Sequence, residues 1–220
     1  RFFDGYPMNA HPMGVLASTV AALSTFYPAR VDGDIELNII RLLAKVKTLA
    51  AFAYKKSIGQ PLIYPKNELC FEENFLHMMF SERQEDYKHD RVVSDALNTL
   101  LILHADHEQN CSTATVRMVG SSQSNLFISI AGGIAALWGQ LHGGANQKVI
   151  EMLKMIYEDG QNYQKYVDKA KDKKSDFKLF GFGHRVYKNF DPRARILKGA
   201  ADRLLDQLGV DDPLLQIAME

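Results

Sequence analysis

The sequence carries no excess of charge of either sign, with 26 Lys and Arg against 26 Asp and Glu among its 220 residues. Binding to a nucleic-acid backbone or an anionic membrane depends on clustered basic residues, so we expect neither partner. Long hydrophobic runs are also lacking. Those at residues 100–103 and 128–138 fall far short of the roughly 20 residues that cross a bilayer. We therefore expect no membrane-spanning segment.

Cysteine is scarce, because only Cys70 and Cys111 are present and they form no Cys-x-x-Cys pair. Two isolated cysteines exclude a disulfide framework and suit a reducing compartment, so we expect a cytoplasmic protein. We interpret both as small buried apolar side chains. An initiating methionine is lacking too, and the last residues continue a helical pattern, which predicts a chain that is cut at both ends.

Strict alternation of apolar and polar residues is rare, whereas helical spacing of apolar residues runs through nearly the whole chain. Asp191 followed by Pro192 is typical of a helix start, and the helix that begins there is expected to run to Gly209. The sequence therefore predicts an all-α fold. The expected helices cover residues 12–26, 35–54, 74–80, 91–104, 112–119, 126–141, 147–157 and 191–209, with a solvated helix face leading into a surface loop at 162–174.

Three histidines lie where predicted helices meet polar or glycine-containing segments, and such junctions attract function more than helix midpoints do. They are His107, His142 and His184. His104 and His107 are three residues apart, on one face of a helical turn. That pair permits a metal site, although its spacing differs from the His-Glu-x-x-His zinc motif. A buried, hydrogen-bonded structural pair is the alternative.

Two glycines directly follow His142, between two predicted helices. Glycine lets the backbone approach a ligand closely, and the next helix begins with unpaired N–H groups. A helix start favours an anion or a neutral imidazole, which can donate a hydrogen bond to a carbonyl that is becoming an enolate. A C-cap glycine beside a core histidine explains the same residues.

Gly181 and Gly183 alternate before His184, without the third glycine of the dinucleotide motif. Their exposed backbone groups suit a flat ring or a phosphate. Basic residues surround this segment, as an anionic substrate requires, and Arg193 is placed for bidentate binding of a carboxylate. A surface basic face is the competing interpretation. The basic residues are Lys178, Arg185, Lys188, Arg193 and Arg195.

Together these segments resemble the citrate synthase family, most closely its bacterial hexameric type. The similar segments follow the family's order along the whole chain, and as a set they are specific. They are His-Pro-Met at 11–13, Ser-Ile-Gly-Gln-Pro at 57–61, Tyr-Pro-Lys-Asn at 64–67, His-Ala-Asp-His-Glu-Gln-Asn at 104–110, Leu-His-Gly-Gly-Ala-Asn at 141–146, Gly-Phe-Gly-His-Arg-Val-Tyr-Lys-Asn at 181–189 and Asp-Pro-Arg at 191–193.

The resemblance implies condensation of acetyl-CoA with oxaloacetate to citryl-CoA, which is hydrolysed to citrate and CoA. His142 matches the family's histidine that stabilises the enol of the acetyl group. His184 matches the histidine that hydrogen-bonds the oxaloacetate ketone and supplies a proton. His107 and Arg193 match residues that bind the dicarboxylate.

The resemblance also implies how the second substrate is held. Gly181, Phe182 and Gly183 match the segment that cradles the adenine of CoA. Acetyl-CoA is thus expected as a co-substrate, with no permanently bound cofactor and no metal.

The family's architecture implies a large helical domain over residues 1–141 and a smaller mobile domain over 142–220. The substrates would lie in the cleft between the two domains, and closure on oxaloacetate would exclude water. The oligomer would be a dimer or a trimer of dimers.

One catalytic group of the family has no counterpart here. Its aspartate, which removes a proton from the acetyl methyl group, belongs to an Asn-Val-Asp segment downstream of the last residue of this chain. Two further substrate arginines and the N-terminal domain of the bacterial type are expected outside it as well, so we expect the 220 residues alone to be inactive. None of the aspartates near the end is assigned the missing role. These are Asp202, Asp206, Asp211 and Asp212.

The bacterial hexameric enzymes suggest one regulatory site, for inhibition by NADH. Tyr27, Arg41 and Lys45 match part of it, whereas the residues around Gln84 do not match. A solvated helix face explains Arg41 and Lys45 equally well.

Three other functions compete with the citrate synthase interpretation. The nearest is 2-methylcitrate synthase, which takes propionyl-CoA, because one extra methylene changes binding by only about 1–3 kcal/mol. The context of Arg185, Tyr187 and Lys188 favours citrate synthase. A non-catalytic helical binding module and an all-α metalloprotein that uses His104 and His107 are the remaining alternatives.

Overall fold

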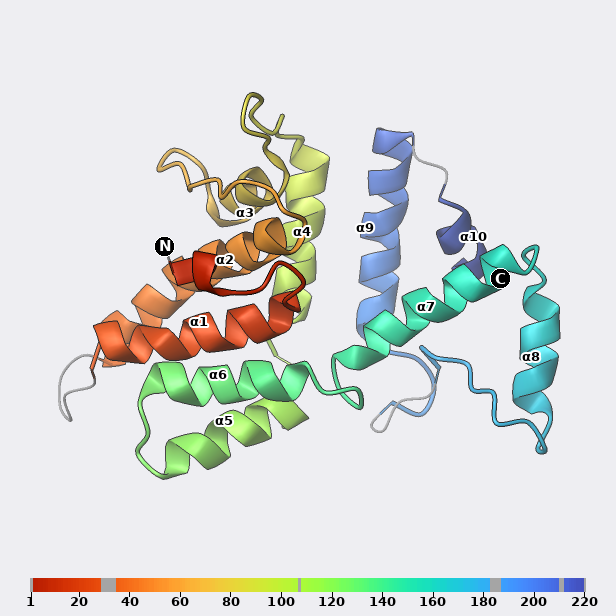
Figure 1. The fold of residues 1–220 in the computed structure, drawn as a ribbon. Coiled ribbons are helices and arrows are strands. Elements are labelled where there is room, and N and C mark those ends of the chain that lie inside the picture. Colours follow the sequence, from red (N-terminus) through yellow and green to blue (C-terminus); the bar gives the residue numbers. More distant parts are fainter. Residues whose placement is uncertain (1, 29–34, 107, 183–186, 210–211, 220) are drawn as a thin grey trace. The chain divides into compact units, whose positions relative to one another are not determined.

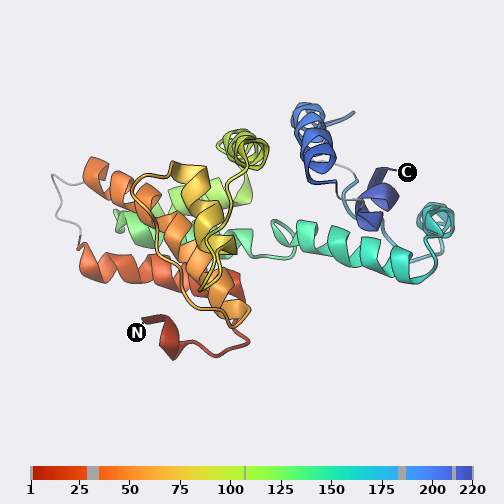
Figure 2. The ribbon, with the colours of Figure 1, turned by 90° about the horizontal axis from the view of Figure 1, so that it is seen from above.

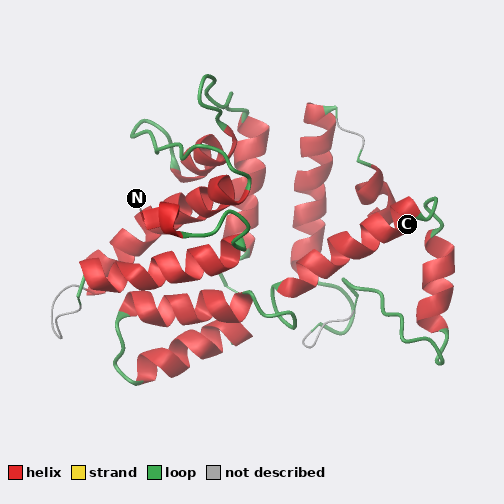
Figure 3. Ribbon diagram, viewed as in Figure 1, coloured by secondary structure: helices red, strands yellow, loops and turns green. Residues whose placement is uncertain are grey.

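The computed structural model describes residues 2–28, 35–106, 108–182, 187–209 and 212–219. In these ranges every regular element is a helix, and no strand occurs among them (Figure 3). The predicted all-α fold is confirmed. The elements are η1 (Phe2–Gly5), α1 (Pro12–Phe26), α2 (Ile35–Ser57), α3 (Phe71–Phe80), α4 (Arg91–Leu103), α5 (Cys111–Ser121), α6 (Leu126–Leu137), α7 (Gly144–Glu158), α8 (Tyr163–Lys171), α9 (Pro192–Leu208) and α10 (Pro213–Met219).

The chain divides into two compact units, Arg1–Trp138 and Gly139–Glu220. The sequence predicts a boundary three residues later, between 141 and 142. The assignment of these units to a large and a mobile small domain stays a prediction.

The first unit is a succession of packed helices in the spatial order α5, α6, α1, α2, α3, α4 (Figure 1). Part of its core joins η1, α1 and α2 through Phe3, Val15, Phe52 and Ala53. The rings of Phe3 and Phe52 meet edge to face, with centroids 5.6 Å apart, which is a favourable aromatic geometry.

Local caps explain where several helices begin. The Nδ1 atom of His11 accepts a hydrogen bond from the Met13 amide, and Pro12 occupies the first turn of α1. The Asp90 carboxylate accepts from the Val92 amide at the start of α4, at 2.7 Å. Gly209 ends α9 with φ +60°, a left-handed cap that glycine adopts without strain.

Helix α6 ends at Leu137 rather than at residue 141, so its predicted length is wrong by one turn. The Gly139 carbonyl accepts from the amides of both His142 and Gly144, at 2.9 and 3.1 Å. These bonds close a turn that replaces the last helical residues and precedes α7.

The two cysteines correct a second prediction, because both are exposed rather than buried. Cys70 is the N-cap of α3, and Cys111 is the first residue of α5. A helix start lies at the rim of a packed layer, which leaves these short side chains accessible. Desolvation raises the pKa of the Cys70 thiol to about 11; the backbone hydrogen bond with Glu73 opposes this rise, and the carboxylate of Glu72 adds to it.

Helices α5 and α6 approach closely because α6 carries adjacent glycines. A Cβ atom on Gly133 would lie 2.6 Å from Val116 Cγ2, whereas one on Gly132 would lie 3.4 Å from Val119 Cγ2. The Ser112 hydroxyl also donates to the Gly133 carbonyl, at 3.0 Å. Of these two glycines, packing therefore requires only Gly133.

We expect Gly133→Ala to lower the free energy of unfolding by about 1–3 kcal/mol, because valine is stiff at χ1 and the helices must separate. Gly132→Ala is the matched control, since its Cβ makes an ordinary contact and alanine favours a helix by up to ~1 kcal/mol. Urea unfolding of both variants tests the difference. Equal destabilisation would contradict this account of the packing.

The second unit has its own core, formed where α7 packs against α10 and α8 (Figure 2). Its buried residues are Met152, Leu153, Ile156, Tyr166 and Ile217. The Tyr166 hydroxyl donates to the Asp159 carboxylate at 2.9 Å, which satisfies the polar end of a buried ring.

None of the helices in the described ranges combines the length and the apolar character needed to span a bilayer.

Candidate functional site

His142 lies in the turn between α6 and α7, two residues before the first residue of α7. The Gly139 carbonyl fixes its backbone amide, and its own carbonyl accepts from the Ala145 amide at 3.2 Å. A Cβ atom on Gly144 would lie only 3.1 Å from the Gly139 oxygen, so glycine fits this turn without displacing the carbonyl. The backbone of His142 is thus fixed in a half-buried position beside a helix N-terminus.

Arg193 is on the first turn of α9 and already binds a carboxylate. Its Nη2 atom donates to Asp191 Oδ2 at 2.6 Å and its Nε atom donates to Asp191 Oδ1 at 3.0 Å. Asp191 also caps the helix, because Oδ1 accepts from the Arg193 amide at 2.9 Å. The sequence predicts that Arg193 binds a substrate carboxylate in a bidentate contact. In the structure, Arg193 makes such a contact with Asp191 of the chain itself.

The segment before His184 lies against α7. Gly181 has φ +88°, and a Cβ atom there would lie 3.2 Å from Val149 Cγ2. The Phe180 amide donates to Met152 Sδ at 3.4 Å, and the Phe182 side chain is 74% exposed. Residues 179–182 of this segment, together with α7, α8 and α10, line an apolar cavity of about 370 Å³.

Three predicted site residues, His107, Gly183 and His184, lie outside the described residues. Of the others, His142 and residues 180–182 belong to one unit and share α7 as their support. Arg193 belongs to the same unit, on α9.

The structure brings together the three residues predicted for regulation. The Arg41 guanidinium lies over the Tyr27 ring, 4.5 Å from its centroid, and Lys45 Nζ lies 5.7 Å from the same centroid. Arg41 also donates to Asn38 Oδ1 at 3.0 Å. An aromatic face beside two cations is a suitable surface for an anionic, ring-containing ligand.

His104 ends α4, and its Nδ1 atom lies 2.7 Å from the Leu100 carbonyl oxygen. This contact engages one ring nitrogen with the backbone. Within the described ranges, no group of three or more His, Cys, Asp or Glu side chains is arranged to hold a metal ion.

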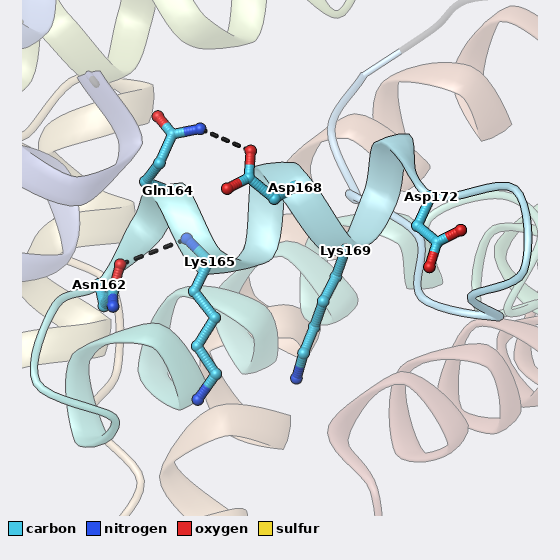
Figure 4. A pocket seen from close by; sticks show the side chains of 6 residues that line it. All are labelled: Asn162, Gln164, Lys165, Asp168, Lys169 and Asp172. Atoms are coloured by element: carbon cyan, nitrogen blue, oxygen red, sulfur yellow. Dashed lines mark hydrogen bonds between the residues drawn. The ribbon is translucent and has the colours of Figure 1, made fainter.

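A polar surface hollow lies along α8 (Figure 4). Gln164 donates to Asp168 at 2.8 Å, and the Lys165 amide donates to the Asn162 side chain at 3.2 Å. These are contacts within one helix and its cap. The solvated helix face predicted for this segment is confirmed, and none of the predicted site residues lines the hollow.

A buried polar cluster in the first unit escaped the sequence analysis. Lys55 is 1% exposed and donates to the Ser81 carbonyl and to Gln60, at 2.7 and 2.5 Å. The Ser81 hydroxyl lies 2.8 Å from His77 Nδ1 and accepts from the Tyr87 amide at 2.8 Å. The cluster ties the loop after α3 to α2. No sequence motif indicates this cluster, because its members come from three separate segments of the chain.

This cluster predicts a pH dependence of stability. Burial, then the charge of Lys66, lower the pKa of His77, with Asp86 opposing and His89 adding to the effect. Below about pH 6.5 the unfolded chain therefore binds a proton that the folded chain does not bind, so the free energy of unfolding falls as pH falls.

We expect His77→Asn to reduce this loss of stability between about pH 7 and pH 5, since it removes the titrating group. Urea unfolding at several pH values measures it. His104→Asn, at an exposed position, is the control and should keep the wild-type slope. A wild-type slope in the His77 variant would contradict the assignment.

The family model "Citrate synthase, C-terminal domain" matches residues 1–220. Citrate synthase 1 of Mycobacterium tuberculosis, in strains CDC 1551 and H37Rv, is 59% identical over 224 residues, and the alignment covers 100% of this chain and 52% of that protein. The chain thus spans about half the length of the curated relatives it matches.

Solved structures give the same result. A ternary complex of Thermoplasma acidophilum citrate synthase with carboxymethyl coenzyme A and oxaloacetate aligns with a TM-score of 0.85 at 28% identity, over 99% of this chain and 56% of that one. Citrate synthase from Pyrobaculum aerophilum aligns with a TM-score of 0.77 at 34% identity, over 96% and 53%. Since the family model spans every residue, the resemblance found from the motifs is confirmed: the chain belongs to the citrate synthase family.

Proposed function

We propose that the protein containing this chain condenses acetyl-CoA with oxaloacetate and water to give citrate and CoA, the entry reaction of the tricarboxylic acid cycle. The observation that carries this proposal is the family match over all 220 residues. The glycine-built turn that holds His142 at the start of α7 supports it independently.

In the proposed reaction, His142 donates a hydrogen bond to the thioester oxygen as the acetyl methyl loses a proton to a carboxylate expected outside this chain. The enol carbon then bonds to the ketone carbon of oxaloacetate, and the ketone oxygen takes a proton from His184. Arg193 and His107 hold the substrate carboxylates. Water finally cleaves the C–S bond of citryl-CoA, which releases citrate and the CoA thiol.

Release of the CoA thiol by the complete protein tests the proposal, with oxaloacetate and either acetyl-CoA or propionyl-CoA. Oxaloacetate-dependent release that prefers acetyl-CoA is the expected result. A preference for propionyl-CoA would assign the protein to 2-methylcitrate synthase. No release from a folded, complete protein would leave the non-catalytic binding module.

The proposal includes a cytoplasmic, self-associating enzyme, as a dimer or a trimer of dimers. The exposed, unpaired Cys70 and Cys111 are consistent with a reducing compartment. Light scattering coupled to gel filtration of the complete protein distinguishes monomer, dimer and hexamer.

We further propose that NADH binds where Arg41 and Lys45 meet the Tyr27 ring. We expect Tyr27→Ala to weaken inhibition by NADH about 5- to 30-fold, because a ring–cation site loses roughly 1–2 kcal/mol when the ring is removed. Inhibition curves at fixed acetyl-CoA measure this, with Tyr54→Ala as a control on stability. Unchanged inhibition in the variant, or none in the wild type, would reject this site.

A further inference from the structure

Helix α7 supports two parts of the proposed acetyl-CoA site at once. His142 lies just before its first residue, Gly144, and Val149 and Met152 face the segment at 180–182. Gly144 and Met152 are about 12 Å apart along the axis, at 1.5 Å per residue. A helix is rigid over this distance, so the turn and the segment keep a fixed separation.

The backbone of the segment makes two direct contacts with α7, in addition to the packing of the Leu179 side chain against the α7 core. The Phe180 amide donates to Met152 Sδ at 3.4 Å, and Met152 is 7% exposed. One residue later, the absent side chain of Gly181 lets the backbone approach Val149. The Phe182 side chain, 74% exposed, is left to face a ligand.

Methionine offers a hydrogen-bond acceptor at position 152 that other apolar side chains of similar size lack. A thioether sulfur is a weak hydrogen-bond acceptor, whereas leucine has a similar size and no acceptor. The bond is partly buried, so its loss leaves a partly shielded amide without this partner. The apolar cavity that the segment itself lines gives the backbone room to shift once the bond is gone.

We propose that Met152, assisted by Val149, is a positioning residue for CoA binding: its sulfur fixes the backbone at Phe180 and thereby places Phe182 relative to His142. The inference rests on the proposed function, since it concerns the same acetyl-CoA site. It adds two residues of α7 that no motif singles out.

The test uses the complete protein with Met152→Leu and, as a matched control, Met155→Leu on the same helix, where the side chain is 39% exposed. We expect Met152→Leu to raise the KM for acetyl-CoA about three- to tenfold, the effect of one lost neutral hydrogen bond. The KM for oxaloacetate, kcat and Tm should stay near wild type. Val149→Ala should shift the same KM in the same direction.

Amide hydrogen exchange provides a readout that needs no substrate. Exchange at Phe180 should accelerate in Met152→Leu and stay unchanged in Met155→Leu. An active wild type whose KM for acetyl-CoA is insensitive to Met152→Leu, or whose two KM values rise equally, would overturn the positioning role, as would unchanged exchange. A folded but inactive wild type would instead overturn the proposed function, and with it the role in CoA binding.

Discussion

Replacing His142 with alanine in the complete protein is expected to lower kcat for citrate formation by about 10²–10³-fold, the usual cost of removing one donor to a developing oxyanion. The side chain lies at a turn whose backbone is fixed by the Gly139 carbonyl. Alanine leaves those backbone bonds intact, so the turn should keep its conformation. Steady-state CoA release and thermal unfolding measure the two effects separately.

Gln147→Ala provides the control for this prediction. Gln147 is on the first turn of α7, and its amide donates to Glu151 at 2.8 Å. It is exposed, and its loss should leave kcat within about twofold of wild type because surface substitutions rarely cost more than 0.5 kcal/mol. A His142 variant that keeps more than a tenth of the wild-type kcat would remove His142 from the proposed mechanism.

The fold was largely predictable because helical periodicity and caps are local signals. The helix from Asp191 to Gly209 was predicted from one cap and one C-terminal glycine, and the structure confirms both ends. The prediction failed at residues 138–141, where apolar residues continue but the Gly139 carbonyl closes a turn. Hydrogen bonds between residues three and five apart compete there with the bonds of a continued helix. The spacing of apolar residues alone does not show whether the turn or the helix forms.

The candidate site was predicted residue by residue, but its supports were not. Motifs predict His142 and Arg193 as site residues, whereas they indicate Asp191 only as a helix cap and do not indicate Met152. Both act through contacts that depend on geometry. Asp191 binds the Arg193 guanidinium in a bidentate contact, and Met152 accepts a hydrogen bond from a backbone amide 28 residues away in sequence. The cluster around Lys55 was missed for the same reason.

The pair of Asp191 and Arg193 leads to the second large effect. We expect Arg193→Lys to raise the KM for oxaloacetate by about 30-fold or more, since a lysine cannot reproduce a bidentate contact with a carboxylate. The KM for acetyl-CoA should change much less. Initial rates at varied concentrations of each substrate measure the two constants, and an unchanged KM for oxaloacetate would contradict the role of Arg193.

Asp191→Asn separates two opposite roles of the carboxylate. If Asp191 competes with the substrate for Arg193, removing its charge lowers the KM for oxaloacetate; if it orients the guanidinium, the KM rises. We expect a rise of about three- to tenfold, because Asp191 holds both Nε and Nη2 while its own position is fixed by the cap of α9. Asparagine caps a helix as well as aspartate, so stability should hardly change.

Asp212→Asn is the matched control for this last variant. Its carboxylate accepts a hydrogen bond from the Leu214 amide at 2.8 Å, at the start of α10. The substitution therefore alters a carboxylate that caps a helix and leaves the contact between Asp191 and Arg193 unchanged. A KM for oxaloacetate that rises in Asp191→Asn and not in Asp212→Asn locates the effect in the ion pair. A fall in the Asp191 variant would mean that the carboxylate blocks Arg193, and that the substrate must displace it before binding.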